Sequence, residues 1–195
     1  MSIQGEAVTV QLAAAGQHNV LNALAAAACC SAIGISAAKI VEGLQAFAPV
    51  SGRLQLKLAA AGARLIDDTY NANPDSVKAA IDVLAKVNAG TTLVLGDMGE
   101  VGADGAAFHQ EIGQYAKAQG IQHLYTLGSL AKSSTIAFGS GAQHFDELSM
   151  LLAKLDHQNG SGNTILIKGS RFMKMERVVA HLMNAVGNTA ASGTH

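Results

Sequence analysis

The sequence predicts an α/β protein, with a Rossmann-like open and mostly parallel sheet that carries helices on both faces and follows a short helical segment. Three observations support this. From residue 63 onward, short apolar runs alternate with helical patterns of roughly ten to twelve residues. Alanine-rich helical patterns fill most of the first 47 residues. Between these zones, Pro49, Ser51 and Gly52 form a boundary typical of a linker.

The first zone contains one expected strand and two expected helices. Apolar residues alternate over 6–12, which predicts a short strand. An apolar helical pattern covers 19–33, and Gly34 ends it. Ser36 caps a second helix, which we expect to run to Phe47.

The second zone is periodic. Strands are expected at 54–58, 63–66, 92–95, 123–127, 143–145 and 164–167. Helices are expected at 77–87, 108–119, 130–138, 146–155 and 175–186. The sequence therefore divides into residues 1–48, a domain over 49–187, and a tail over 188–195 without periodicity.

Composition excludes several classes of protein. The chain has 195 residues, of which 49% are hydrophobic and 14% charged, so intrinsic disorder is excluded. A net charge of −1 gives no basis for nucleic-acid binding. No apolar run reaches the roughly 18 residues of a membrane helix, and no secretory signal is visible, so no membrane insertion is expected. The two cysteines, Cys29 and Cys30, are adjacent, which favours a reducing cytoplasm.

Candidate site residues follow four of the expected strands, where open α/β sheets bind ligands. These segments are 67–74, 96–100, 128–129 and 168–171. The adjacent carboxylates Asp67 and Asp68 repel each other, so each requires a partner such as ribose hydroxyls, a metal or a cation. For Asn73 a capping role and a role in the site are equally open, because Asn73 is a natural N-cap and Pro74 fits the first turn of a helix.

Polar residues also open the first helix. Asn19 and Asn22 are three residues apart and share a face. A capping role explains Asn19 but leaves Asn22 unexplained. The seven histidines lack metal-ligand spacing, and we expect His109 to mark only the start of a helix. No phosphate-binding loop of the GxxxxGK[ST] or GxGxxG type occurs.

Several segments together resemble the Mur ligases, which add amino acids or dipeptides to the cell-wall precursor. The matching segments lie, in family order, at 16–23, 51–54, 67–76, 95–98 and 168–176, and include Tyr-Asn-Ala-Asn-Pro and Lys-Gly-Ser-Arg. Gln17 departs from the family pattern, where arginine is frequent.

The resemblance implies that residues 1–48 end a central ATPase domain and that 49–187 form the C-terminal domain. The function that the resemblance implies is that of an ATP-dependent ligase, which joins D-alanyl-D-alanine to UDP-N-acetylmuramoyl-tripeptide through an acyl phosphate. Its N-terminal domain, phosphate-binding loop and Mg²⁺ ligands are expected outside this chain. A monomer in the cytoplasm is expected, and the chain alone is expected to be inactive.

The resemblance also implies residue roles. Adenine would be held by Asn19 and Asn22, with His18 beside them. Ribose hydroxyls would bind Asp68, and ATP phosphates would lie near Arg53. Close to the nucleotide would lie Tyr70, Asn71 and Asn73. The dipeptide or acyl phosphate would face Lys168, Ser170 and Arg171, and the catalytic residues would be Arg53, Lys168 and Arg171.

Two alternatives stay open. In a receiver-like phosphoacceptor domain, Asp67, Asp68, Asp97 and Lys168 would form the acidic pocket and its lysine. That hypothesis leaves residues 1–47 and Arg171 without roles. A ligase similar to folylpolyglutamate synthase shares the fold and mechanism, but the 168–176 segment argues against it.

Overall fold

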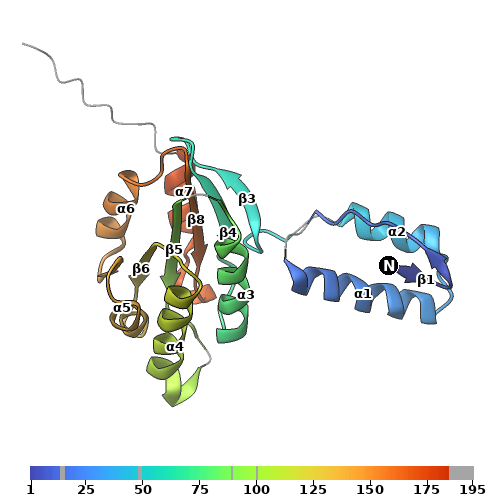
Figure 1. Ribbon diagram of the computed structural model, residues 1–195, viewed down its shortest axis with the longest axis horizontal. Coiled ribbons are helices and arrows are strands. Elements are labelled where there is room, and N and C mark those ends of the chain that lie inside the picture. The colour runs from blue at the N-terminus through green and yellow to red at the C-terminus, as the bar shows by residue number, and fades with distance from the viewer. Residues whose placement is uncertain (14–15, 48–49, 89, 100, 185–195) are drawn as a thin grey trace, which may run out of the picture.

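The chain folds into a small helical unit followed by an α/β domain (Figure 1). The structure is a computed structural model that describes residues 1–13, 16–47, 50–88, 90–99 and 101–184. The tail expected over 188–195 lies outside the described residues. No helix in these ranges has both the length and the apolar character to cross a membrane.

The helical unit consists of α1 (Gln17–Ala32), α2 (Ala37–Ala46) and a short hairpin of β1 (Ser2–Ile3) and β2 (Glu6–Ala7). Both helices were predicted by the sequence, and α1 begins two residues earlier than expected. The core of the unit is small and contains Ile3, Ala27, Ala37 and Ile40.

The strand expected over residues 6–12 is only partly present. Strand β2 covers two residues and pairs antiparallel with β1, Ile3 lying opposite Glu6. Beyond it, the described residues up to 13 form no strand. Apolar alternation marks a strand only where a neighbouring strand takes up the backbone N–H and C=O groups, and β1 is too short to do this.

The α/β domain contains a six-stranded sheet in the order β3-β4-β8-β5-β6-β7. Only β3 is antiparallel to its neighbour. The strands are β3 (Gln55–Leu58), β4 (Arg64–Asp68), β5 (Gly90–Gly96), β6 (His123–Leu127), β7 (Ala142–Phe145) and β8 (Asn163–Lys168). The predicted open, mostly parallel sheet is confirmed.

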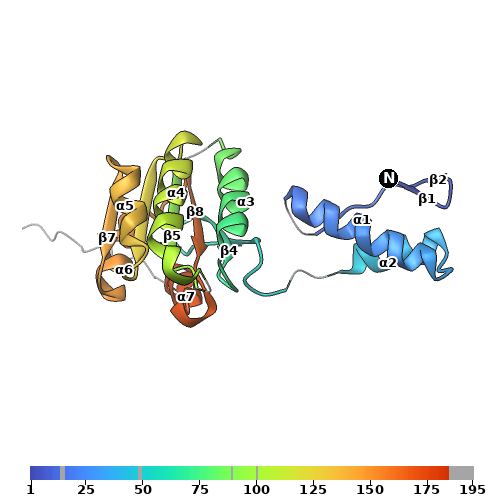
Figure 2. The ribbon, with the colours of Figure 1, turned by 90° about the horizontal axis from the view of Figure 1, so that it is seen from below.

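Helices cover both faces of this sheet (Figure 2). They are α3 (Pro74–Ala85), α4 (Gly105–Ala118), α5 (Lys132–Phe138), α6 (Leu148–Asp156) and α7 (Glu176–Asn184). Successive strand residues point to opposite faces. Leu93 therefore packs in the core beneath α3 and α4, while Val94 packs in the core beneath α6 and α7.

The start of α3 confirms a capping interaction that the sequence predicted. The Asn73 side chain accepts the Ser76 N–H at 2.8 Å, and the Ser76 hydroxyl accepts the Asn73 N–H at 3.1 Å. Pro74 occupies the first helical turn, where its missing N–H costs nothing. This capping box fixes where the loop after β4 ends.

His109 is fully buried, although the sequence suggested only a residue near a helix start. Its Nε2 accepts the Met98 N–H at 3.0 Å, and its Nδ1 lies 2.7 Å from the Gly105 carbonyl oxygen. Since a carbonyl can only accept, Nδ1 carries the proton and the ring is neutral. His109 thus joins the loop after β5 to the first turn of α4.

We expect His109 to make the stability of the fold fall in mild acid. Burial lowers the pKa of His109 below its ordinary value of 6.5, against smaller raising effects of the Gly105 carbonyl and Asp97. The unfolded chain therefore binds the proton more readily, and this stability is complete above about pH 6.5 and is lost below it. The loss has a slope of up to about 1.4 kcal/mol per pH unit.

The measurement is the free energy of unfolding in urea between about pH 8 and pH 5, for the wild type and for His109→Gln. Glutamine can still hydrogen-bond but does not titrate, so the two curves should converge as the pH falls. Parallel curves would show that His109 does not contribute to the pH dependence.

Candidate functional site

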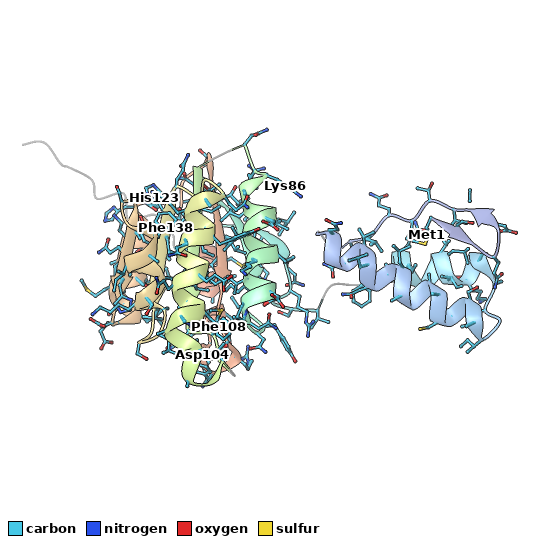
Figure 3. The ribbon with its side chains drawn as sticks, turned by 60° about the horizontal axis from the view of Figure 1, so that its bottom comes forward. Met1, Lys86, Asp104, Phe108, His123 and Phe138 are labelled. Carbon is cyan, nitrogen blue, oxygen red and sulfur yellow. The ribbon has the colours of Figure 1, made fainter. Side chains whose placement is uncertain are left out.

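Polar loops gather at the edge of the sheet where its parallel strands end. In Figure 3, Asp104 and Phe108 near the start of α4 lie at the opposite end of the domain from His123, which begins β6. A cavity of about 750 Å³ lies close to the edge where the strands end, between the α/β domain and the helical unit. This volume falls in the range of small-molecule sites.

The cavity brings together most of the residues that the sequence singled out. Its polar wall includes Asn19 and Asn22 from α1, and Arg53, Asp68, Tyr70, Asn71, Asn73 and Lys168 from the α/β domain. Its apolar wall was not anticipated and includes Leu12, Ala23, Ala26, Leu44, Phe47 and Val50. The side chain of His18 lies outside the described residues.

The adjacent carboxylates after β4 each have a lysine partner. Asp67 accepts a hydrogen bond from Lys57 Nζ at 2.6 Å, and a second from the Thr69 hydroxyl at 2.7 Å. Asp68 accepts from Lys168 Nζ at 2.5 Å. The two carboxylates point to opposite faces of the strand, so only Asp68 lines the cavity. Of the partners proposed from the sequence, the structure provides a cation for each.

Lys168 is the most buried cation of this site, with 3% of the residue exposed. Its ammonium group donates to Asp68 Oδ2 and, at 2.8 Å, to the Asn71 carbonyl. Burial lowers the pKa of Lys168, and nearby Arg53 lowers it further, while Asp68 opposes both effects. The pair therefore places two charges deep in the cavity wall.

The turn at residues 52–54 docks against the end of β4. The Tyr70 N–H donates to the Gly52 carbonyl at 2.9 Å, and the Leu54 N–H donates to Asp68 Oδ1 at 3.1 Å. The Arg53 guanidinium lies over the Tyr70 ring, 4.5 Å from its centroid. Gly52 has φ +74°, and an added Cβ would lie 2.9 Å from the Tyr70 nitrogen. Only glycine fits here, a constraint that the sequence analysis did not predict.

Two expected acceptor-side residues lie outside the cavity wall. The Ser170 hydroxyl accepts the Gly99 N–H and donates to the Ala72 carbonyl at 3.2 Å. Its backbone N–H donates to the Asp97 carbonyl at 2.9 Å. Ser170 therefore ties together the loops that follow β4, β5 and β8.

Arg171, the other residue, lies in a short 3₁₀ turn beside the same loops and remains largely exposed. Its guanidinium donates to Glu176 Oε1 at 2.6 Å. This ion pair can exchange partners, because both side chains reach solvent.

The geometry does not support the phosphoacceptor hypothesis. Asp97 is 6% exposed, and its carboxylate accepts the Ala131 N–H at 2.7 Å. Gly128 packs so closely over it that an added Cβ would meet the carboxylate carbon at 2.5 Å. Lys168 pairs with Asp68 and not with Asp97. Asp97 thus holds the loop after β6 and is not presented to solvent.

Within the described ranges, no group of three or more histidine, cysteine, aspartate or glutamate side chains could hold a metal ion.

The fold and this site define a Rossmann-like α/β domain with a cavity at the carboxyl edge of its parallel sheet, the edge where domains of this class bind their ligands. The sequence profile of "Mur ligase, glutamate ligase domain" matches residues 52–171. The chain belongs to the Mur ligase family, and its α/β domain is the one that this profile describes.

Individual relatives support this assignment. The UDP-N-acetylmuramoyl-tripeptide--D-alanyl-D-alanine ligase of Escherichia coli K12 is 40% identical over 177 residues, 90% of this chain and 39% of the relative. A crystal structure of MurF from Acinetobacter baumannii is 37% identical, with a TM-score of 0.80 over 89% of this chain and 39% of that one. Thermotoga maritima MurF, solved with ADP, shares the fold at 24% identity and TM-score 0.77, over 90% and 40% of the two chains. The chain thus spans about two fifths of the length of these relatives.

The docked turn generates a stability prediction. We expect Gly52→Ala to lower the free energy of unfolding by about 2–4 kcal/mol, because a left-handed φ and a close contact both oppose a Cβ. Gly120→Ala is the matched control, with φ +78° and nothing within 4 Å of the added atom. It should cost only about 1 kcal/mol.

Urea unfolding of the two variants and the wild type provides the comparison. Equal losses at positions 52 and 120 would mean that the turn is not held tightly against Tyr70.

Proposed function

We propose that this chain supplies the C-terminal part of an ATP-dependent ligase that joins D-alanyl-D-alanine to UDP-N-acetylmuramoyl-tripeptide in cytoplasmic peptidoglycan synthesis. The cavity carries this proposal, because it gathers amides, a guanidinium and a carboxylate from two separate parts of the chain. Relatives named for this reaction, at 40% and 37% identity, favour it over a ligase similar to folylpolyglutamate synthase.

The chemistry of the wall suits a nucleotide. Ala23 and Ala26 offer an apolar surface for a purine, and the amides of Asn19 and Asn22 lie on the same helix for its polar edge. Asp68 keeps acceptor capacity beyond its bonds to Leu54 and Lys168, and a carboxylate can accept ribose hydroxyls. Tyr70, Asn71 and Asn73 complete this wall of the cavity.

In this proposal Arg53 would meet phosphate oxygens. A guanidinium binds phosphate in a planar, bidentate manner, and the Tyr70 ring holds this one at the cavity wall. Leaving the ring costs little, since an exposed cation–π contact contributes about 0.5–1 kcal/mol. Arg53 can therefore exchange the aromatic contact for a phosphate when a nucleotide enters.

In the proposed reaction, the tripeptide carboxylate attacks the γ-phosphorus of ATP, ADP leaves, and an acyl phosphate forms. The amine of D-alanyl-D-alanine then attacks the acyl carbon, loses a proton and expels phosphate. Arg171, exposed beside the loops at the carboxyl edge, would stabilise the negative charge on the tetrahedral intermediate. Ser170 would fix these loops, and Mg²⁺ would be bound by residues outside this chain.

In the longer ligase, we expect Asp68→Ala to raise the KM for ATP by about 10- to 100-fold. The reason is that the variant loses charge-assisted hydrogen bonds to the nucleotide that contribute about 1.5–3 kcal/mol. The KM for the dipeptide should change little. Asp146→Ala is the control, because it removes an exposed carboxylate that follows another strand of the same sheet. Steady-state kinetics test both variants. A large dipeptide effect with an unchanged KM for ATP would move Asp68 to the acceptor side.

The 195-residue chain alone should fold but neither hydrolyse ATP nor join peptides. Phosphoryl transfer requires a phosphate cradle and a bound Mg²⁺, and the sequence contains no GxxxxGK[ST] loop. Phosphate release is measured with ATP, the tripeptide precursor and the dipeptide, beside a calorimetric ATP titration. Turnover above the no-protein control would show that the catalytic groups lie within this chain.

A further inference from the structure

Lys168 and Asp68 occupy matching positions in the sheet. They are the last residues of the neighbouring parallel strands β8 and β4, and the register places them directly opposite each other. Their side chains are 3% and 11% exposed, and Nζ lies 2.5 Å from Oδ2. A second bond from Nζ reaches the Asn71 carbonyl in the loop after β4. The ammonium group is therefore hydrogen-bonded to two residues of the polar wall of the cavity, Asp68 and Asn71.

Through Asp68, this ion pair is connected to the turn that carries Arg53. One carboxylate oxygen accepts from Lys168, and the other accepts the Leu54 N–H at 3.1 Å. Leu54 has φ +45°, a conformation that non-glycine residues avoid. Such a conformation persists only where surrounding contacts enforce it, and the bond to Asp68 is one such contact.

We propose that Lys168 is a positioning residue for the nucleotide, which acts through Asp68 and Asn71 to hold the 52–54 turn and to keep Arg53 directed at the phosphates. The inference rests on the proposed function, and it moves Lys168 from the expected acceptor side to the ATP side. In this role Lys168 would contact neither the reacting carboxyl group nor the dipeptide.

The consequence of losing Lys168 follows from charge. Without the ammonium group, the Asp68 carboxylate is left in a buried place without its counterion, which is strongly unfavourable. Arg53 lines the same cavity and directly precedes Leu54, whose N–H is bonded to Asp68, so it is a nearby cation available to replace the ammonium. An Arg53 drawn toward Asp68 would be lost to the phosphates, and ATP binding would weaken.

The chain contains a matched control for this ion pair. Lys57 bonds to Asp67, the residue adjacent to Asp68, at 2.6 Å. That carboxylate is also buried, but it points to the opposite face of β4, and neither residue lines the cavity. Lys57→Met therefore removes a comparable lysine–aspartate pair without affecting the polar wall of the cavity.

The first experiment uses the 195-residue chain without nucleotide and measures amide hydrogen exchange by NMR. In Lys168→Met, exchange at Leu54 should accelerate by about tenfold, equivalent to the net loss of one hydrogen bond to a charged group. Lys57→Met should leave Leu54 unchanged. Unaltered exchange at Leu54 in Lys168→Met would overturn the proposed connection. If that variant does not fold, the double variant Asp68→Asn/Lys168→Gln replaces it, and exchange at Leu54 is again expected to accelerate.

The second experiment uses steady-state kinetics of the longer ligase. Lys168→Gln should raise the KM for ATP by about tenfold or more and leave the KM for the dipeptide within about twofold. The double variant Asp68→Asn/Lys168→Gln should differ from Asp68→Asn alone by less than about twofold in the KM for ATP, because both residues act as one unit. Lys57→Met should change neither constant.

The outcomes separate the inference from the proposed function. A raised dipeptide KM with an unchanged KM for ATP, or effects of Lys168→Gln and Asp68→Asn that multiply, would overturn the positioning role. A wild-type ligase that does not use ATP would overturn the proposed function, while the exchange experiment would still report whether Lys168 supports the 52–54 turn.

Discussion

The buried ion pair between Asp68 and Lys168 is the interaction on which the arrangement of the site depends. It joins the ends of two neighbouring strands, fixes the loop after β4 through Asn71, and supports the 52–54 turn through Leu54. Desolvation makes such a pair a weak source of stability. Its value lies in geometry, because each partner is held by further hydrogen bonds that leave it a single position.

The sheet provides this pair through its topology. Parallel neighbours present their carboxyl ends at one edge, so residues 100 positions apart in the sequence become adjacent. Alternation along β4 then separates the two aspartates: Asp67 faces Lys57 on one side, and Asp68 faces Lys168 on the other. The repulsion expected between adjacent carboxylates is relieved by placing each beside its own cation on a different face.

Local signals allowed most of the fold to be predicted, and contacts distant in sequence explain what could not be. Apolar periodicity located the six strands of the sheet, and the cap at Asn73 was readable because its partner is three residues away. The strand over residues 6–12 failed because it lacks a sufficient partner strand. The role of His109 depends on Met98, on a loop that sequence periodicity does not connect to α4. Similarly, only the fold shows that Ser170 joins three loops.

The polar wall of the cavity draws on both parts of the chain, and this determines what a ligand there would do. Asn19 and Asn22 belong to α1, whereas Arg53 is tied to the α/β domain by the docking of its turn on β4. A molecule that contacts residues of both parts binds most tightly when α1 and the α/β domain are arranged so that both reach it. Its binding therefore favours that arrangement of the two parts. Because Arg53 is anchored to the same domain as Asp68, a nucleotide would meet the guanidinium and the carboxylate as one preassembled unit. The amides of α1 would complete the site from the other side.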